Sequence, residues 1–190
     1  MFAGHFGLAA AVKAKTPEVP LWALMLSTQL LDVVFVPLFL SGVETMEPVD
    51  GTGYGASIIH ADYTHSLAGA LLISFLAGLL ARTFWGKRSG LVIGSVVFSH
   101  WLLDLLVHRM DLPLLPGNLG NLPLLGFGLW QLPAVSIALE LLLLVIGFIM
   151  YARSLLSGSA GKTRAWAFAA SGVMGLLLVL ALVTDVLGVG

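Results

Sequence analysis

The chain has 190 residues, of which 58% are hydrophobic and 10% are charged, and its mean hydropathy is +1.01. Because charged residues make up about 25% of a soluble domain, this composition excludes an ordinary soluble domain and indicates an integral membrane protein. A formal net charge of −1 gives no electrostatic basis for binding nucleic acid, and a chain without cysteine has neither disulfides nor thiolate metal ligands.

The apolar segments predict an all-α fold, a polytopic transmembrane helical bundle with five full spans plus a short N-terminal membrane segment. Residues 2–12 are shorter than the roughly 20 residues that cross a bilayer, so they predict a partial or re-entrant helix. Pro37 is expected to kink the first long span. Residues 1–190 form one domain, with a metal-site region in about 1–130 and scaffold helices in about 129–188. The full spans are expected at residues 20–42, 63–83, 89–108, 129–152 and 165–187.

Two connecting segments are distinctive. Residues 43–62 contain a Gly-rich stretch, Gly51-Thr52-Gly53-Tyr54-Gly55, but no predicted strand precedes it and no βαβ unit follows. We therefore expect a flexible loop there rather than a dinucleotide site. Residues 109–128 are rich in Pro, Gly and Asn and are apolar for an aqueous loop, so we expect them to lie over the helix ends at the membrane interface.

The basic residues are unevenly distributed between the two sides of this topology. Only Arg109 falls on the side that holds residues 43–62, residues 109–128 and both termini. By the positive-inside tendency the opposite side is cytoplasmic, so both termini are expected outside the cytoplasm. The cytoplasmic side then holds eight of the nine Lys and Arg residues, namely Lys13, Lys15, Arg82, Lys87, Arg88, Arg153, Lys162 and Arg164.

The most informative stretch is Ser99-His100-Trp101-Leu102-Leu103-Asp104-Leu105-Leu106-Val107-His108. On a helix, His100, Asp104 and His108 follow an i, i+4, i+8 spacing and share one face. Ionisable groups inside a membrane are rare and costly, and they usually mark a site. The plain alternative is a buried polar seam that only holds helices together. Two imidazoles and a carboxylate are also a common ligand set for a divalent metal.

Further ionisable side chains are expected in the outer half of the same bundle. We predict metal coordination by His65, His100 and Asp104, with Asp32 as a fourth ligand or as the general base. His65 has an alternative reading as part of a helix start that Thr64 caps. The remaining histidines, His5, His60 and His108, are candidates for orienting the ligands, for binding a second metal, or for holding a phosphate or leaving group.

Of these three histidines, we predict His60 as a metal ligand. His5 and His108, together with Asp32, are predicted as catalytic residues. Each also has an ordinary reading, His5 as an interfacial residue and His60 as a loop residue. Glu140, in the middle of the span 129–152, is either a carboxylate that contributes to helix contacts or a participant in catalysis.

A short sequence pattern occurs in two of the predicted helices. Ser27-Thr28-Gln29-Leu30-Leu31-Asp32 and Ser99-His100-Trp101-Leu102-Leu103-Asp104 share the pattern Ser-x-x-Leu-Leu-Asp. Both helices run from the cytoplasmic side outward. The pattern is compatible with a parallel repeat that presents two carboxylates, and equally with chance in a Leu-rich protein.

Imidazole and carboxylate ligands suit zinc, manganese or iron, with zinc favoured here. A metal-bound water becomes a nucleophile near neutral pH, so the leading hypothesis is a membrane-embedded metal-dependent hydrolase of an ester or phosphoester. The bilayer is the expected partner, and a lipid or another amphiphile is the expected substrate at the outer leaflet. Two alternatives stay open: a transporter or channel for protons or metal ions, and a structural protein with a polar packing cluster.

The order and spacing of five sequence elements resemble those of the bacterial membrane-bound metal-dependent hydrolases, inner-membrane proteins of the YdjM/YbcI type. The resemblance covers about residues 1–130 and implies a multi-pass protein with a divalent metal and hydrolase activity. In one respect the chain differs, because the family's Asp-x-Asp-His is replaced by Asp32 and three apolar residues, which removes one ligand of a two-metal site. The five elements are Gly4-His5, Asp32, His60-x-x-x-Thr64-His65-Ser66, Ser99-His100-x-x-x-Asp104 and Pro113-Leu114-Leu115-Pro116.

Overall fold

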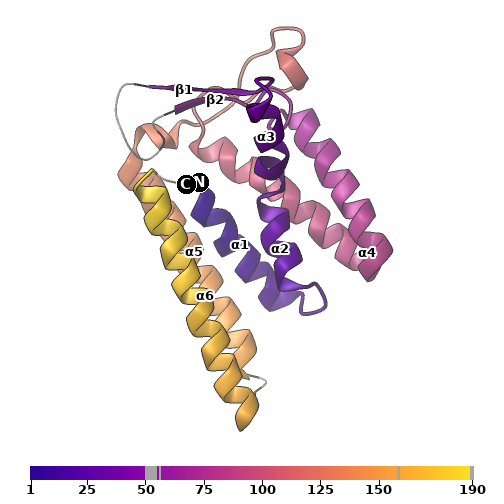
Figure 1. Cartoon of the computed structure of the whole chain (residues 1–190), viewed down its shortest axis with the longest axis vertical. Coiled ribbons are helices and arrows are strands. Elements are labelled where there is room, and N and C mark those ends of the chain that lie inside the picture. Colours follow the sequence, from indigo (N-terminus) through magenta and orange to yellow (C-terminus); the bar gives the residue numbers. More distant parts are fainter. Residues whose placement is uncertain (50–54, 56, 158, 189–190) are drawn as a thin grey trace.

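The computed structural model describes residues 1–190 except 50–54, 56, 158 and 189–190, and the described residues are mostly helical (Figure 1). Helices α4, α5 and α6 are the longest elements, and a small hairpin lies across one end of the molecule. In chain order the elements are α1 (Phe2–Lys15), α2 (Leu21–Thr28), α3 (Leu30–Leu40), β1 (Thr45–Pro48), β2 (Ser57–His60), α4 (Leu67–Val107), the 3-10 turns η1 (Pro116–Asn118) and η2 (Leu129–Gln131), α5 (Pro133–Ser157) and α6 (Lys162–Val186).

Among the described residues, three helices are long and apolar enough to cross a membrane, namely α4, α5 and α6. A fourth candidate exists if α2 and α3, which are bent by 50° relative to each other, form one broken span. The chain is therefore a candidate multi-pass membrane protein, but the prediction of five full spans is wrong. Helices α5 and α6 agree with the last two predicted spans.

The difference in span count comes mainly from α4, which contains both of the spans predicted at residues 63–83 and 89–108. Its backbone leaves the helical region at Gly86 (φ 82°, ψ 173°), a conformation that favours glycine. The two arms then lie side by side (Figure 1). A Cβ atom at Gly78 would lie 2.9 Å from the Gly90 carbonyl oxygen, so small residues permit this close approach. As a result, both ends of α4 lie at the same end of the molecule.

The break between α2 and α3 lies at Gln29 and not at Pro37, which is inside α3. Two long-range contacts account for its position. The Thr28 carbonyl oxygen accepts a hydrogen bond from His100 Nδ1, and Gln29 Nε2 donates to the Phe2 carbonyl oxygen. Diverting the Thr28 carbonyl from the helical ladder favours a bend at this residue.

The prediction of an all-α fold is also corrected, because β1 and β2 pair as an antiparallel hairpin with Thr45 opposite His60. The Gly-rich residues 51–54, predicted as part of a flexible loop, lie outside the described residues. The segment 109–128 lies over the helix ends as expected: the carbonyl groups of Pro113 and Leu114 accept hydrogen bonds from the first backbone amides of α4. Ser66, and not Thr64, caps that helix through its side chain.

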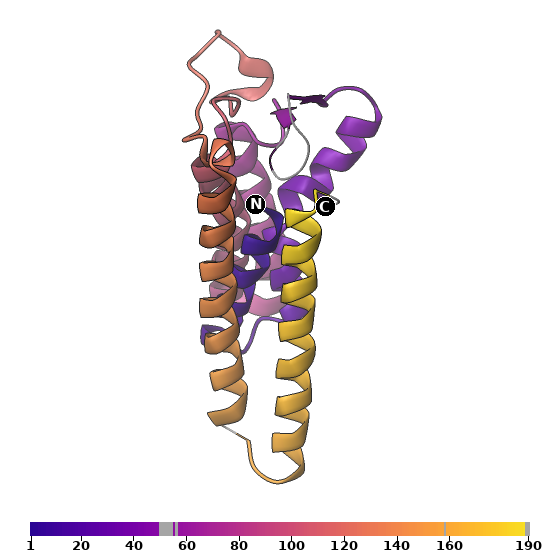
Figure 2. The same cartoon turned by 90° about the vertical axis from the view of Figure 1, so that its left-hand side faces the viewer.

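Helix α1 fits between the long C-terminal pair and α2 (Figures 1 and 2). A Cβ atom at Gly147 of α5 would lie 2.0 Å from the Gly7 carbonyl oxygen of α1, so two glycines allow the backbones of these helices to touch. This close contact holds the start of α1 beside the upper end of α5. His5 is buried there, one turn into the helix.

Candidate metal centre

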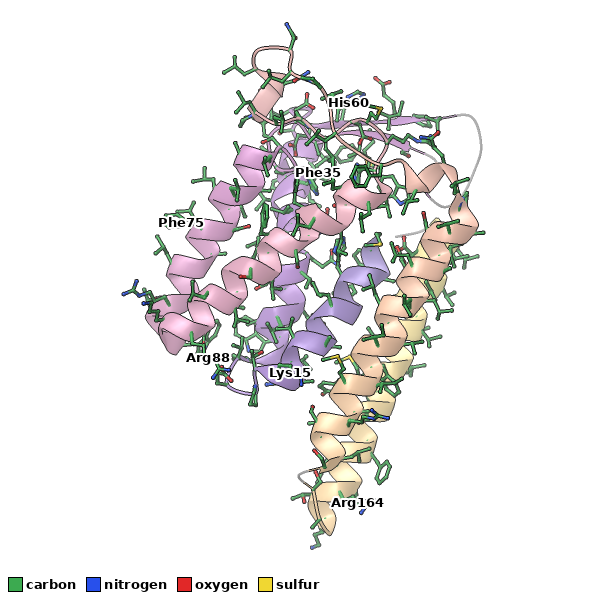
Figure 3. The ribbon with its side chains drawn as sticks, turned by 180° about the vertical axis from the view of Figure 1, so that it is seen from behind. Lys15, Phe35, His60, Phe75, Arg88 and Arg164 are labelled. Atoms are coloured by element: carbon green, nitrogen blue, oxygen red, sulfur yellow. The ribbon has the colours of Figure 1, made fainter. Side chains whose placement is uncertain are left out.

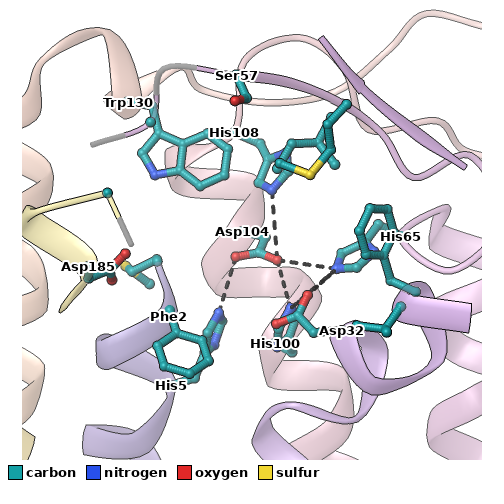
Figure 4. Close-up of a pocket in the computed structure, with 17 residues that line it drawn as sticks. Phe2, His5, Asp32, Ser57, His65, His100, Asp104, His108, Trp130 and Asp185 are labelled. Carbon is teal, nitrogen blue, oxygen red and sulfur yellow. Dashed lines mark hydrogen bonds and ion pairs between the residues drawn. The ribbon is translucent and has the colours of Figure 1, made fainter. Parts of the chain in front are cut away.

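A cavity of about 440 Å³ lies at the end of the bundle beneath the β1–β2 hairpin. Four of the five histidines meet in it with Asp32 and Asp104, and they come from three separate segments of chain (Figure 4). Helix α1 supplies one, α3 supplies one, and α4 with the residues flanking its two ends supplies the rest. In chain order these six residues are His5, Asp32, His65, His100, Asp104 and His108.

The tightest group consists of His65, His100 and Asp32. The Nε2 atoms of the two histidines are 3.3 Å apart. Asp32 Oδ1 lies 3.3 Å from His65 Nε2 and 3.6 Å from His100 Nε2. Three potential ligand atoms from residues 33 to 68 positions apart in the sequence therefore converge on one small volume.

Asp104 connects this group to the other histidines. Its Oδ2 atom lies 2.9 Å from His100 Nε2, 3.7 Å from His65 Nε2 and 3.9 Å from His108 Nε2. Its Oδ1 atom lies 3.2 Å from His5 Nε2. The Asp104 carboxylate is buried. Imidazole nitrogens contact both of its oxygens, as the dashed lines of Figure 4 show.

The Nδ1 atom of His65 is held by a chain of buried polar groups. Thr64 Oγ1 lies 2.9 Å from it and also lies 3.1 and 3.0 Å from the two carboxylate oxygens of Glu44. A carboxylate only accepts, so the Thr64 hydroxyl donates to Glu44 and accepts from His65. This assigns the proton of neutral His65 to Nδ1 and leaves the lone pair on Nε2.

His100 on α4 and His108 directly after it show the same arrangement. The Nδ1 atom of His100 lies 2.5 Å from the Thr28 carbonyl oxygen, and that of His108 lies 2.9 Å from Asp111 Oδ1. Both partners are acceptors, so each Nδ1 carries the proton. In metal sites, ligating histidines are oriented in this way by an acceptor on the second ring nitrogen.

These tautomers test whether the residues fit a cation. With Nδ1 protonated, the Nε2 lone pairs face carboxylate oxygens, and acceptors at such distances repel each other unless a proton or a cation lies between them. In a tetrahedral zinc site with bonds of about 2.0–2.1 Å, ligand atoms are about 3.3–3.4 Å apart. The Nε2 atoms of His65 and His100 lie 2.9 to 3.7 Å from each other and from the nearest carboxylate oxygens of Asp32 and Asp104. The donor set therefore fits a divalent metal.

The structure places the remaining predicted residues differently. His5 stacks on His100 with ring centroids 3.9 Å apart and an interplanar angle of 5°. The structure does not bring His60 to the others, because it lies on β2 with Nε2 3.6 Å from Glu47 Oε1. Glu140 does not line the cavity, and its Oε1 atom lies 3.9 Å from the amino group of Met1.

Sequence reasoning missed the residues that support the histidines. Glu44 is buried and accepts hydrogen bonds from the backbone amides of Tyr63 and Thr64 as well as from the Thr64 hydroxyl. Asp111 accepts from His108 and also from the backbone amide of Ile59, which ties β2 to the site. The spacing of three residues between His108 and Asp111 was the only local signal, and Glu44 had none.

Comparison with protein-family models, with curated proteins and with solved structures gives no match. No family is therefore assigned to the chain, and the geometry of the site is the basis for proposing a function.

Proposed function

We propose that the protein is a membrane-embedded metal-dependent hydrolase that acts on an ester or phosphoester, including an ester of a lipid. The observation that carries this proposal is the common orientation of His65, His100 and His108. Each has Nδ1 against an acceptor and Nε2 directed at the buried carboxylate of Asp104, and His65 and His100 also face the partly exposed Asp32. Such an arrangement is costly inside a protein unless the carboxylates hold a positive charge.

In this proposal the cation, zinc with manganese or iron as alternatives, is held by His65, His100, Asp104 and Asp32. Bound with a fifth coordination position for water, it would supply Lewis-acid chemistry and would lower the pKa of that water toward neutrality. His5 keeps Asp104 in position, because its Nε2 atom is 3.2 Å from Oδ1 and its ring stacks on His100.

Hydrolysis of an ester or phosphoester requires that one proton leave the attacking water and one reach the departing alkoxide. We assign this proton transfer to His108. Its Nδ1–H donates to Asp111 Oδ1 at 2.9 Å, its Nε2 faces the cavity, and the ring contacts Trp130 with centroids 4.2 Å apart. The carboxylate of Asp111 fixes the tautomer and stabilises the imidazolium that forms when Nε2 takes a proton.

The proposed orientation follows from the basic residues. In Figure 3, Lys15, Arg88 and Arg164 lie at the end of the molecule opposite His60. By the positive-inside tendency that end is cytoplasmic, so the cavity opens toward the outer leaflet of a bacterial inner membrane. His60 is not proposed as a ligand, because it lies apart from the cluster.

The experiment compares metal content and hydrolysis in one set of proteins. Zinc-equilibrated wild type, His100→Ala and His60→Ala are purified in detergent, and zinc per chain is measured by elemental mass spectrometry. Each is then assayed with p-nitrophenyl acetate and bis-p-nitrophenyl phosphate, before and after chelation. His60→Ala is the matched control, because it removes an imidazole outside the cluster.

We expect one tightly bound zinc in wild type and in His60→Ala, its loss in His100→Ala, and hydrolysis that follows the zinc. A proton on each Nε2 would satisfy the same carboxylates without metal. Wild-type protein that binds no divalent ion would therefore remove the hydrolase proposal and leave the polar packing cluster or a proton relay. Zinc binding without hydrolysis, together with metal flux in proteoliposomes, would favour the transporter.

A further inference from the structure

The β1–β2 hairpin covers the cavity on the side away from the membrane-spanning helices. Met46, Ser57 and Ile59 of the hairpin line it, and Ser57 lies above His108 in Figure 4. Two contacts hold the hairpin and its connection in place. The Ile59 amide donates a hydrogen bond to Asp111, and Gly55 lies so close to Trp130 that an added Cβ atom would be 2.7 Å from its side chain. Hairpin residues and Trp130 therefore line the cavity on the side away from the spans.

The side of the cavity between α3 and the C-terminal end of α6 is more open. Asp32 has 41% of its side chain exposed, whereas the side chains of His65, His100 and Asp104 have 5% or less. Helix α3 packs on α2 and α4, and α6 packs on α5 and α1, so the two helices form opposite walls. The rim on the α3 side is apolar and includes Val36, which is 50% exposed.

This opening faces the bilayer, because its walls belong to helices whose outer surfaces are apolar. On the α6 side the rim contains Phe2 and Asp185 (Figure 4). An apolar rim around a polar interior matches a molecule with a polar head and apolar chains, which can remain partly in the membrane while its head reaches the site.

The charge of the cavity restricts the head group. Asp32, Asp104 and Asp185 line it, and no Lys or Arg is found among its described lining residues. A divalent cation held at the centre would balance the charges of Asp32 and Asp104 and leave the negative charge of Asp185. Among the described contacts, Asp185 Oδ2 accepts one hydrogen bond, from the backbone amide of Ala3. The amino group of Met1, a positive charge nearby, lies against Glu140.

We propose that this cavity takes the head group of a membrane amphiphile that has no net negative charge, such as a zwitterionic phospholipid, and that the molecule reaches it sideways between α3 and α6. The inference rests on the proposed hydrolase, since it names the substrate class of that site. An ammonium group is favoured near Asp185 and the rings of Phe2 and Trp130, whereas an anionic head group is repelled.

The test uses the full chain in vesicles of equimolar dioleoyl phosphatidylcholine and dioleoyl phosphatidylglycerol, equilibrated with zinc. The protein is extracted in mild detergent and weighed by native mass spectrometry, which resolves bound zinc and bound lipid separately. Val36→Phe narrows the opening. Val33→Phe is the matched control, because Val33 lies on α3 with 48% exposure but does not line the cavity.

We expect wild type to retain phosphatidylcholine over phosphatidylglycerol by about tenfold. Val36→Phe should lower the retained lipid by about threefold or more, because the larger ring fills the opening, and Val33→Phe should not. Asp185→Asn should bring the ratio of the two lipids toward one. Equal retention of both lipids by wild type, or equal effects of the two Val substitutions, would overturn the inference.

The same spectra separate this inference from the proposed function. Zinc bound without lipid selection contradicts the sideways route and leaves the metal centre standing. Lipid selection without zinc under any condition supports the head-group site and removes the hydrolase. The wild-type lipid ratio requires no variant, so the inference stays testable even if a substituted protein does not fold.

Discussion

Thr64→Val tests the support of His65 without changing a proposed ligand. Valine has nearly the shape of threonine, so the substitution removes one oxygen from a buried position. That oxygen accepts from His65 Nδ1 at 2.9 Å and lies 3.0 Å from the nearer carboxylate oxygen of Glu44. Without it, the proton of His65 is no longer held on Nδ1, and the tautomer with Nε2–H, which cannot bind a metal through Nε2, becomes more populated.

The size of the effect follows from two independent ranges. Leaving a buried donor without its partner costs about 1–3 kcal/mol. Removal of a group that orients a metal-ligating histidine typically weakens metal affinity by about 10–100-fold, which corresponds to about 1.4–2.7 kcal/mol. Because the two ranges overlap, we expect Thr64→Val to raise the zinc Kd by about 10–100-fold.

The assay is competition between the detergent-solubilised protein and a chromogenic zinc chelator. Thr83→Val is the matched control, since the Thr83 hydroxyl is on an exposed part of α4 and donates to the Leu80 carbonyl oxygen. Its zinc Kd should equal that of wild type. A folded Thr64→Val protein with a Kd within about twofold of wild type would refute the assignment of Nδ1 as the donor in His65.

Other predictions concern the fold and its orientation. Gly147→Ala should destabilise the protein by about 1–3 kcal/mol or more in thermal unfolding, because its Cβ would lie 2.0 Å from the Gly7 carbonyl oxygen. Gly172→Ala, on α6 with no atom within 4 Å of the added Cβ, should unfold at or slightly above the wild-type temperature. Since the chain has no cysteine, Glu47→Cys should react with an impermeant maleimide in intact cells, and Thr163→Cys only after permeabilisation; the reverse pattern would invert the proposed topology.

The meeting of His65, His100, Asp104 and Asp32 could be predicted from sequence because the signals were local and strong. Charged groups in apolar helices must find partners, and the i, i+4 spacing put His100 and Asp104 on one face. The distribution of basic residues then placed the ends of the helices on common sides. The carboxylates of the Ser-x-x-Leu-Leu-Asp pattern do lie in the same cavity.

Features that depend on partners distant in sequence could not be predicted. The bend at Gln29 coincides with contacts from His100 to Thr28 and from Gln29 to Phe2, whereas Pro37, the local signal for a kink, is accommodated within α3. The hairpin consists of two strands of four residues each, too short for a clear alternating pattern. The position of His60 outside the cluster follows from its place on β2.

The supporting acids illustrate the same limit. Glu44 precedes β1 in a segment that looked like an ordinary charged loop, yet it is 1% exposed and accepts hydrogen bonds from Tyr63 and Thr64. Nothing in its neighbours signals that role. It bonds to backbone amides of the turn that leads into α4, about 20 residues further along the chain.

Zinc K-edge X-ray absorption of the zinc-loaded protein shows whether His65, His100, Asp32 and Asp104 hold one divalent cation. We predict a single first shell of nitrogen and oxygen atoms at about 2.0–2.1 Å, with the outer-shell scattering of two imidazoles. That imidazole signal should weaken in His65→Ala. Zinc with oxygen ligands alone, or an unchanged spectrum in His65→Ala, would contradict the account.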